Sequence, residues 1–362
     1  MDRFAEYRAA ARALGTDAVA LVPGANFVRM MGQDFSTSER PTLIVVPVEG
    51  TPAAIMPNLE LSSFAQLNFP GEVFDWRDQD GYDAAFAALA AHLPLSSLAV
   101  EGQTMRVFVH HALAKAYPGL AITDGERAIS GLRLVKTADD IARMTRAIRI
   151  SEAALGEVLA DVRVGMTERE VEARLIAAQF AHGAEGMAFS PIVAANTNSA
   201  LPHAHARDYA LQTGDALLID FGAQWGGFCA DITRTVFVGH ATDHQAAVYQ
   251  TVYDAVEAGL AVTTAGVTAH EIDDAVQSVL EASSWPDRIR TKTGHGLGRQ
   301  VHEEPYVMRG NHQKLPAGAV YTNEPGLYDT AEFGIRIEDD VLVTDTGYRL
   351  LTTFPKTLTV VG

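Results

Sequence analysis

The chain has 362 residues, which exceeds one ordinary domain and predicts two. It carries 28 Lys and Arg against 45 Asp and Glu, and this net charge of −17 disfavours binding to nucleic acid or to an anionic membrane. Its single cysteine, Cys229, excludes an internal disulfide and indicates a reducing compartment. The first residues lack a secretory signal pattern, and no apolar run has membrane-spanning length. We therefore expect a soluble, cytoplasmic protein.

The first segment, up to about Leu132, alternates predicted helices and strands. Apolar residues at helical spacing predict a helix from Phe4 to Leu14, and an Ala-rich helix is expected from Tyr82 to His92. Short apolar runs bounded by Pro, Gly or Asn predict strands of a mixed sheet at 18–22, 42–48, 53–56 and 98–100. Potential metal ligands do not gather anywhere in this segment.

A polar loop is expected between two of these strands, at 32–41. One interpretation is that it only connects the strands. The other is that Asp34 or Arg40 projects into the cleft of a neighbouring subunit and recognises a substrate terminus, because a planar guanidinium suits a carboxylate. The sequence leaves both interpretations open.

A domain boundary is expected near residue 132, which gives domains at 1–132 and 133–362. A long amphipathic helix is predicted at the start of the second domain, over 138–162. The sequence at 165–171 recurs at 266–272, and both copies contain Thr-x-x-Glu, a capping box that starts a helix. Two related helix-turn-helix units predict two pseudo-symmetric halves with a cleft between them. Chance similarity of two short caps is the alternative.

Acidic residues within apolar strands mark the second domain. Asp220 ends one apolar strand, a glycine-containing hairpin turn comes next, and a return strand over 228–238 carries Asp231. Acids on neighbouring strands can converge on one point, and a buried carboxylate is costly unless it is paired or binds a metal. The alternative is that each acid meets a local arginine, since Arg234 is close by.

Three more potential ligands lie downstream. His295 lies between two glycines, which allow close approach of the backbone, and Glu324 stands at the end of a short strand. A strand over 334–343 alternates so that Arg336 and Glu338 face the same space. For His295 taken alone, the alternative interpretation is an ordinary polar residue. For the strand taken alone, the alternative is that Arg336 and Glu338 are ordinary charges on a solvent-exposed face.

Together, four carboxylates and one imidazole form an oxygen-rich set suited to two divalent cations: Asp220, Asp231, His295, Glu324 and Glu338. This set favours Mn²⁺ or Co²⁺, with Zn²⁺ or Fe²⁺ also suitable, and the absence of thiolates argues against a structural zinc site. In dinuclear hydrolases two such ions lie about 3.5–4 Å apart and share a water or hydroxide that acts as the nucleophile. The predicted reaction class is metal-assisted hydrolysis.

These ligands and their neighbours resemble, in chain order, the pita-bread metallopeptidases of the M24B type, and among them the Xaa-Pro peptidases, prolidase and aminopeptidase P. The matching segments are 199–203, 219–222, 231–235, 294–298, 302–305, 323–326 and 334–340. The resemblance implies an α+β fold, with a C-terminal pita-bread (creatinase/aminopeptidase) domain of two pseudo-two-fold halves. A smaller creatinase-like α/β domain would precede it, form a homodimer and partly cover the active site.

The resemblance also implies roles for single residues. All five potential ligands match metal ligands of the family. His203 would face the substrate, His302 would contact the scissile carbonyl or the bound peptide, and Arg336 would orient the substrate and the metal cluster. Glu324 is the candidate for moving a proton from the water to the leaving imino nitrogen. His205 has no match and is interpreted as an ordinary polar residue.

The expected activity is hydrolysis of the Xaa-Pro bond in a small peptide with proline at its second position. A dipeptidase is slightly favoured over an aminopeptidase acting on longer peptides, and only recognition of the peptide termini separates the two. Other enzymes of the same fold, a creatinase-like hydrolase or a metal-dependent lyase, are further alternatives, as is an inactive binding module. The complete ligand set disfavours the metal-free creatinase type and the binding module.

Overall fold

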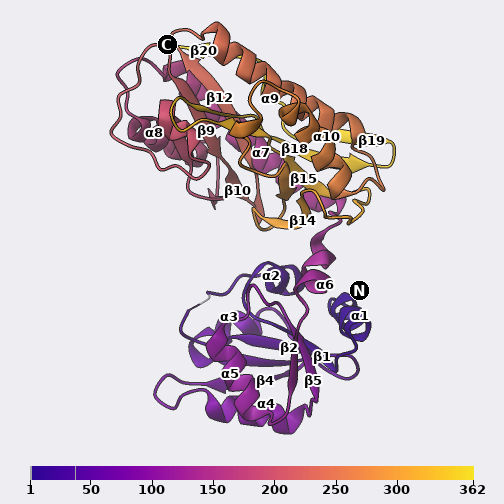
Figure 1. Ribbon diagram of the computed structural model, residues 1–362. Coiled ribbons are helices and arrows are strands. Elements are labelled where there is room, and N and C mark those ends of the chain that lie inside the picture. Colours follow the sequence, from indigo (N-terminus) through magenta and orange to yellow (C-terminus); the bar gives the residue numbers. More distant parts are fainter. Residues whose placement is uncertain (1, 37) are drawn as a thin grey trace. The chain divides into compact units, whose positions relative to one another are not determined.

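The computed structural model describes residues 2–36 and 38–362 (Figure 1). The chain forms two compact units, Met1–Arg133 and Leu134–Gly362, which are described separately. Across the described residues, every helix is too short or too polar to cross a membrane.

A six-stranded mixed sheet with the strand order β4-β3-β2-β1-β5-β6 forms the N-terminal unit (Figure 1). Its strands are β1 (Ala18–Leu21), β2 (Leu43–Pro47), β3 (Ala53–Pro57), β4 (Glu72–Trp76), β5 (Ser97–Val100) and β6 (Ala121–Asp124). The helices are α1 (Ala5–Leu14), α2 (Ala25–Met31), α3 (Leu61–Ala65), α4 (Asp83–His92), α5 (Val107–Ala116) and α6 (Glu126–Ser130), with 3₁₀ turns at Asn58–Glu60 and Gly131–Arg133. The predicted mixed sheet is confirmed, and the edge strands β4 and β6 are additional to the prediction.

Both faces of this sheet are covered, which explains why its central strands are apolar at every position. Ala20 and Val45 pack on one face with Phe86 of α4. Their neighbours Val19 and Ile44 pack on the opposite face, in a cluster that includes residues of α1 and α2. Because successive side chains of a strand alternate between faces, a strand covered on both sides has no polar position.

Two pairs of long helices organise the C-terminal unit. They are α7 (Ala138–Asp161) with α8 (Glu168–Ala181), and α9 (Asp243–Val262) with α10 (Ala269–Glu281). Each helix begins at a threonine whose hydroxyl accepts a hydrogen bond from the backbone three residues on, while the side chain there reaches back: Thr137, Thr167, Thr242 and Thr268. The two predicted capping boxes are confirmed, and the other two have the same pattern with Asp or Gln in place of Glu.

The strands of this unit form several small sheets. One has the order β20-β12-β9-β8 and another the order β14-β13-β15-β18-β19, while β11-β10-β7 and β16-β17 are smaller. The bounds are β7 (Gly186–Met187), β8 (Ile192–Ala195), β9 (Ala216–Phe221), β10 (Ala223–Trp225), β11 (Phe228–Cys229), β12 (Ile232–Val238), β13 (Gly294–Gly296), β14 (Glu303–Val307), β15 (Val320–Asn323), β16 (Gly326–Tyr328), β17 (Gly334–Arg336), β18 (Asp339–Thr344), β19 (Gly347–Leu350) and β20 (Val360–Val361). Short 3₁₀ segments lie at Asn196–Ala200 and Pro286–Arg288.

The pseudo-symmetry is visible in matching backbone contacts at the start of α8 and α10. Gly165 donates its N–H to the carbonyl of Leu211 at 2.8 Å, and Gly266 donates to Leu315 at the same distance. Isolated antiparallel bridges lie at equivalent places, Thr167 with Ala210 and Thr268 with Lys314. Each helix pair therefore contacts its own downstream segment in the same way, and the pseudo-symmetric halves predicted from the repeated sequence are confirmed.

Two predicted continuous strands are wrong, because each is broken at an acid. The expected strand over 228–238 divides into β11 and β12, with Asp231 in the break, and its backbone N–H donates to the Asp340 carboxylate at 3.3 Å. The expected strand over 334–343 divides into β17 and β18 around Glu338, whose N–H donates to the carbonyl of Thr233 at 3.1 Å. The breaks let one segment pass from one small sheet to another and turn its acid inward.

Candidate metal centre

All five predicted metal ligands line one cavity of about 330 Å³ in the C-terminal unit, together with His203, His302 and Arg336. Asp220 lies in β9 directly opposite Thr233 of β12, while Glu324 comes directly after the last residue of β15. His295 is in the middle of β13. Strand ends and strand breaks thus direct the acids toward a common space.

The glycines beside His295 are required by the close approach of the neighbouring strands. A Cβ on Gly294 would come within 1.8 Å of the carbonyl oxygen of Thr322, and one on Gly296 within 2.1 Å of that of Glu304. These distances are too short for any side chain. The predicted close approach of backbone at these glycines is confirmed.

Side-chain atoms of the acids and the imidazole lie within coordination range of one another. His295 Nε2 is 3.0 Å from Glu324 Oε1 and 3.7 Å from Asp231 Oδ2. Asp231, His295 and Glu338 each offer a ligand atom within 4.8 Å of the others. Asp220 Oδ1 and Glu338 Oε1 are buried and have no hydrogen-bond partner among the described residues. A buried carboxylate oxygen without a donor is a suitable ligand for a hard cation, so this donor set fits divalent metal ions.

The titration behaviour of the acids reflects their crowding. Burial raises the pKa of Asp231 and of Glu338 well above the usual value, and neighbouring carboxylates raise both further. Burial also raises the pKa of Asp220, against the opposing charge of Arg336. For Glu324 burial acts in the same direction, but the hydrogen bond and charge of His295, followed by Arg336 and Lys292, lower its pKa overall. So many buried acids cannot all ionise without added positive charge.

Arg336 supplies part of that charge. Its Nη2 donates to Asp220 Oδ2, its Nη1 donates to the Tyr328 hydroxyl at 2.9 Å, and its Nε donates to the Thr233 hydroxyl at 3.2 Å. Arg336 is 3% exposed, so these bonds hold it rigidly. The expectation that Arg336 and Glu338 face the same space is confirmed, since both line the cavity.

The other histidines that line the cavity are more exposed to solvent than His295. The His302 ring packs on His295 with centroids 3.9 Å apart, and burial followed by the charge of His295 lowers the pKa of His302 to about 4. His302 is therefore neutral at pH 7. His203 lines the cavity with an exposed side chain, and so does His205. The sequence interpretation of His205 as an ordinary polar residue missed its place in the wall, because nothing in the local motif distinguishes it from other surface histidines.

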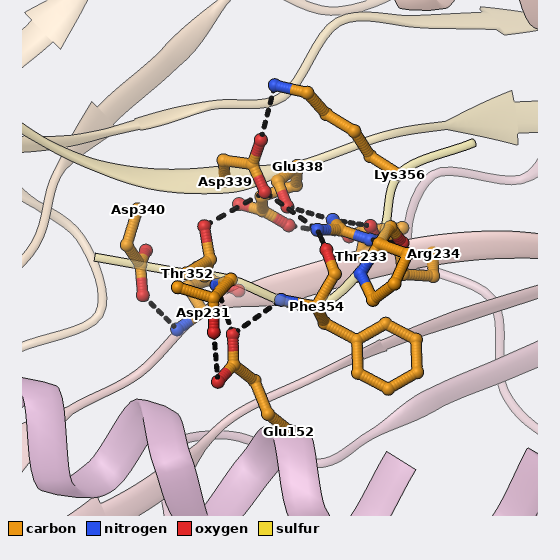
Figure 2. A network of polar contacts seen from close by, with 12 residues as sticks. Glu152, Asp231, Thr233, Arg234, Glu338, Asp339, Asp340, Thr352, Phe354 and Lys356 are labelled. Atoms are coloured by element: carbon orange, nitrogen blue, oxygen red, sulfur yellow. Dashed lines mark hydrogen bonds and ion pairs between the residues drawn. The ribbon is translucent and has the colours of Figure 1, made fainter. Parts of the chain in front are cut away.

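A second network of charges lies beside the cavity (Figure 2). Arg234 Nη2 donates to Asp339 Oδ1 at 2.7 Å, and the other oxygen of Asp339 accepts from Lys356 Nζ at 3.0 Å. Both Arg234 and Asp339 are at most 2% exposed. Arg234 is not the arginine that meets Asp220 or Asp231, because its guanidinium binds Asp339 and nearby carbonyl groups. Asp220 meets Arg336 instead.

The two N-terminal candidates lie in the other unit. Arg40 binds Asp78 through two hydrogen bonds, of 2.9 Å from Nε and 2.8 Å from Nη2, and its Nη1 is 2.7 Å from Glu39 Oε1. Asp34 is exposed and accepts a hydrogen bond from the backbone N–H of Phe35 at 2.9 Å. The guanidinium fork of Arg40 is thus already used within its own unit.

Comparison with known proteins identifies the family of each domain. Residues 142–345 match metallopeptidase family M24, and residues 3–135 match the creatinase/prolidase N-terminal domain. The probable dipeptidase PepE of Mycobacterium tuberculosis (strain ATCC 25618 / H37Rv) is 32% identical over 367 residues, which is 99% of this chain and 96% of that protein.

Solved structures agree over the whole length. The prolidase from Thermococcus sibiricus is 31% identical with a TM-score of 0.93, covering 99% of this chain and 98% of that one. The X-Pro aminopeptidase from Thermotoga maritima MSB8 is also 31% identical, with a TM-score of 0.87 and 100% of both chains covered. Two family models together match both domains, and the five potential ligands lie in one cavity between two related halves. This chain is an enzyme of metallopeptidase family M24 with a creatinase/prolidase N-terminal domain.

Proposed function

We propose that the chain is an Xaa-Pro dipeptidase that holds two divalent metal ions and releases proline from dipeptides. The observation that carries this proposal is the shared cavity of Asp220, Asp231, His295, Glu324 and Glu338, with two carboxylate oxygens left unpartnered among the described residues. The similarity to PepE and to the T. sibiricus prolidase supports the substrate class.

The two ions, when bound, supply an activated water and polarise the scissile carbonyl. Mn²⁺ is the metal we propose, because four carboxylates and one imidazole suit it, with Co²⁺, Zn²⁺ and Fe²⁺ as alternatives. Asp220 and Asp231 bind from one half of the unit, and His295, Glu324 and Glu338 bind from the other. Arg336 holds Asp220 in its ligand position.

Proton transfer and charge stabilisation fall to residues of the cavity wall. Glu324, whose pKa is lowered, is ionised and able to accept the proton of the attacking water, then deliver it to the imino nitrogen of proline. His302 is neutral and donates one ring N–H to the developing oxyanion, as does His203. A protonated imidazole is therefore not needed at His302.

The leaving nitrogen of an Xaa-Pro bond has no N–H to recognise, so selection depends on the shape of the proline ring and on charges near it. Apolar residues of the lining offer a surface for the ring: Phe189, Ile192, Pro202 and Val301. The dipeptidase and aminopeptidase activities differ in the group attached to the proline on its C-terminal side. This group is a free carboxylate in the first case and a further peptide bond in the second.

The experiment compares an Xaa-Pro dipeptide with an Xaa-Pro-Xaa tripeptide, using protein stripped by a chelator and then refilled with Mn²⁺. We expect proline release from the dipeptide, absent in stripped protein and restored by the metal. Preference for the tripeptide would identify an aminopeptidase. Failure of the refilled protein to cleave either peptide would contradict the peptidase assignment and favour non-peptide substrates.

We also propose a cytoplasmic homodimer. The compartment is inferred from the single cysteine, Cys229, which is buried and unpaired. Dimer formation through the N-terminal domain is what the family resemblance implies. Light scattering coupled to size exclusion is expected to give twice the mass of one chain, and a monomer at micromolar concentration would contradict the dimer.

A further inference from the structure

A dipeptidase needs a cation that tells a free carboxylate from a peptide bond. In an Xaa-Pro dipeptide the carboxylate is attached to the proline ring, so the cation has to lie close to the reacting bond. Arg336 lies in the cavity wall and donates hydrogen bonds to Asp220, Tyr328 and Thr233. Each of its three guanidinium nitrogens already donates to a group of the protein, and its charge faces the ligand Asp220.

Lys292 is a cation beside the same cavity. It is the residue after Thr291, which lines the cavity, and precedes the strand of His295 by two residues. Its Nζ lies 5.7 Å from the centroid of the Tyr306 ring, and Tyr306 is the cross-strand partner of His295. The half-buried Lys292 therefore lies on the side of the sheet that carries the histidine ligand.

The ammonium of Lys292 is held by an aromatic ring. Within residues 2–36 and 38–362, the Lys292 ammonium forms no ion pair with a carboxylate, and its close contact is the face of Tyr306. An ammonium held only by a ring face is free to exchange that contact for a stronger one with an anion.

We propose that Lys292 binds the C-terminal carboxylate of the dipeptide and so determines that the enzyme removes a terminal proline. This inference rests on the proposed function. The flexible four-carbon stem of lysine lets the ammonium move from Tyr306 to the substrate, and its point charge needs no fixed geometry. Tyr306 holds the ammonium near the cavity when substrate is absent.

A peptide that continues beyond proline, or that ends in an amide, presents no charge to Lys292. The ammonium then loses part of its water without gaining an anion. A charge-assisted hydrogen bond of this kind corresponds to about 10- to 100-fold in kcat/KM. The structure thus predicts a preference of that size for the free acid over the amide.

The test measures the activity of wild-type protein and several variants on two substrates. An Xaa-Pro dipeptide and the corresponding Xaa-Pro amide are compared with wild-type protein, Lys292→Met, Lys292→Arg and the control Lys314→Met, all refilled with Mn²⁺. Lys314 is exposed and absent from the cavity wall, and its substitution changes the net charge equally. Metal content and melting temperature are measured for each variant, so that loss of metal or of folding is recognised independently of activity.

For Lys292→Met we expect kcat/KM to fall about 10- to 100-fold on the dipeptide and to stay unchanged on the amide, with Lys292→Arg recovering most of the preference. Lys314→Met is expected to behave as wild type on both. Equal losses on the two substrates would overturn the inference, because Lys292 would then act on the acid cluster and not on the substrate.

A further variant addresses the polar loop of the N-terminal unit. If Arg40→Ala abolishes the preference for the free acid while Lys292→Met keeps it, the carboxylate is bound by Arg40 and the inference is wrong. Wild-type enzyme that cleaves only the tripeptide, or neither peptide, overturns the proposed dipeptidase itself. If wild type prefers the free acid and Lys292→Met keeps the same preference, the dipeptidase stands and the role of Lys292 is overturned.

Discussion

The hydroxyl of Thr233, in β12, donates a hydrogen bond of 2.5 Å to Oε2 of Glu338, which lies in the break between β17 and β18. The same hydroxyl accepts from Nε of Arg336 at 3.2 Å. A hydroxyl has one proton to give, so its donation to the carboxylate and acceptance from the guanidinium fix the orientation of both groups. Thr233 is fully buried, and water cannot replace it.

Replacing Thr233 by valine, which has nearly the same shape, should weaken metal binding. Glu338 Oε2 and Arg336 Nε would both lose their partner in a buried site, and the ligand carboxylate would no longer be held in position. Loss of such a supporting group typically reduces metal affinity about 10- to 100-fold. Titration of chelator-stripped protein with Mn²⁺ in a calorimeter measures the change.

Thr233→Ser is the matched control, because it keeps the hydroxyl and removes only a methyl group. Its affinity for Mn²⁺ should stay within a few-fold of wild type. If Thr233→Val bound the metal as tightly as Thr233→Ser, the hydroxyl would have no part in holding Glu338.

Substitution of Glu324 by glutamine should reduce turnover. The amide cannot accept a proton from the attacking water, and loss of a general base typically lowers kcat about 10²- to 10⁴-fold. The metal content of the purified variant, measured by emission spectroscopy, separates this effect from loss of a ligand. Near-normal kcat in a variant that holds its full complement of metal would remove Glu324 from the proton-transfer role.

Arg234 should contribute strongly to stability. It donates to Asp339 and to four backbone carbonyls, including those of Phe354 and Pro355 in the C-terminal segment. Arg234→Met leaves Asp339 with Lys356 and Thr352 as hydrogen-bond partners in a buried setting. Breaking a buried ion pair on one side costs about 3–5 kcal/mol, which urea denaturation followed by circular dichroism detects.

Arg174 provides the comparison, since its pair with Asp161 is exposed on both sides. Arg174→Met should change the free energy of unfolding by less than about 1 kcal/mol. Similar losses for the two variants would show that the Arg234 network is no more stabilising than a surface pair.

Stability of the N-terminal unit should depend on pH through Glu101. Burial raises the pKa of this carboxyl to about 7, and the hydrogen bond from Asn26 only partly opposes it. A carboxyl with a raised pKa in the folded state binds its proton more tightly there than when unfolded. Stability is therefore greatest below the unfolded pKa of about 4.5 and falls as the pH rises through 7, by up to about 3 kcal/mol.

Glu101→Gln mimics the protonated acid and keeps the acceptor for Asn26. It should raise the melting temperature at pH 8, change little at pH 5, and flatten the dependence between them. Scanning calorimetry of the full chain at several pH values measures this. An unchanged pH profile in Glu101→Gln would exclude Glu101 as its source.

Much of the site was accessible to sequence reasoning because the ligands sit where such residues are costly. An aspartate at the end of the apolar run before Phe221, or a histidine between Gly294 and Gly296, has few stable explanations apart from a partner with charge. The capping threonines Thr167 and Thr268 were also predictable from the sequence, because a capping box involves only residues three positions apart.

The rest depends on contacts between distant parts of the chain. Nothing near Asp231 in sequence reveals that Asp340 accepts its backbone N–H and breaks the strand there. The edge strands β4 and β6 were missed because they are partly exposed and carry polar residues at Glu72 and Asp124. Lys292 gains significance only from Tyr306, which lies on another strand.

The matched helix pairs have an evolutionary consequence. Asp220 and Asp231 come from the half that begins with α7, whereas His295, Glu324 and Glu338 come from the half that begins with α9. Neither half carries enough ligands to hold two ions. An ancestor consisting of one half would have needed a second copy of itself to form a centre, so gene duplication and fusion would have turned an interface between two chains into the active site of one.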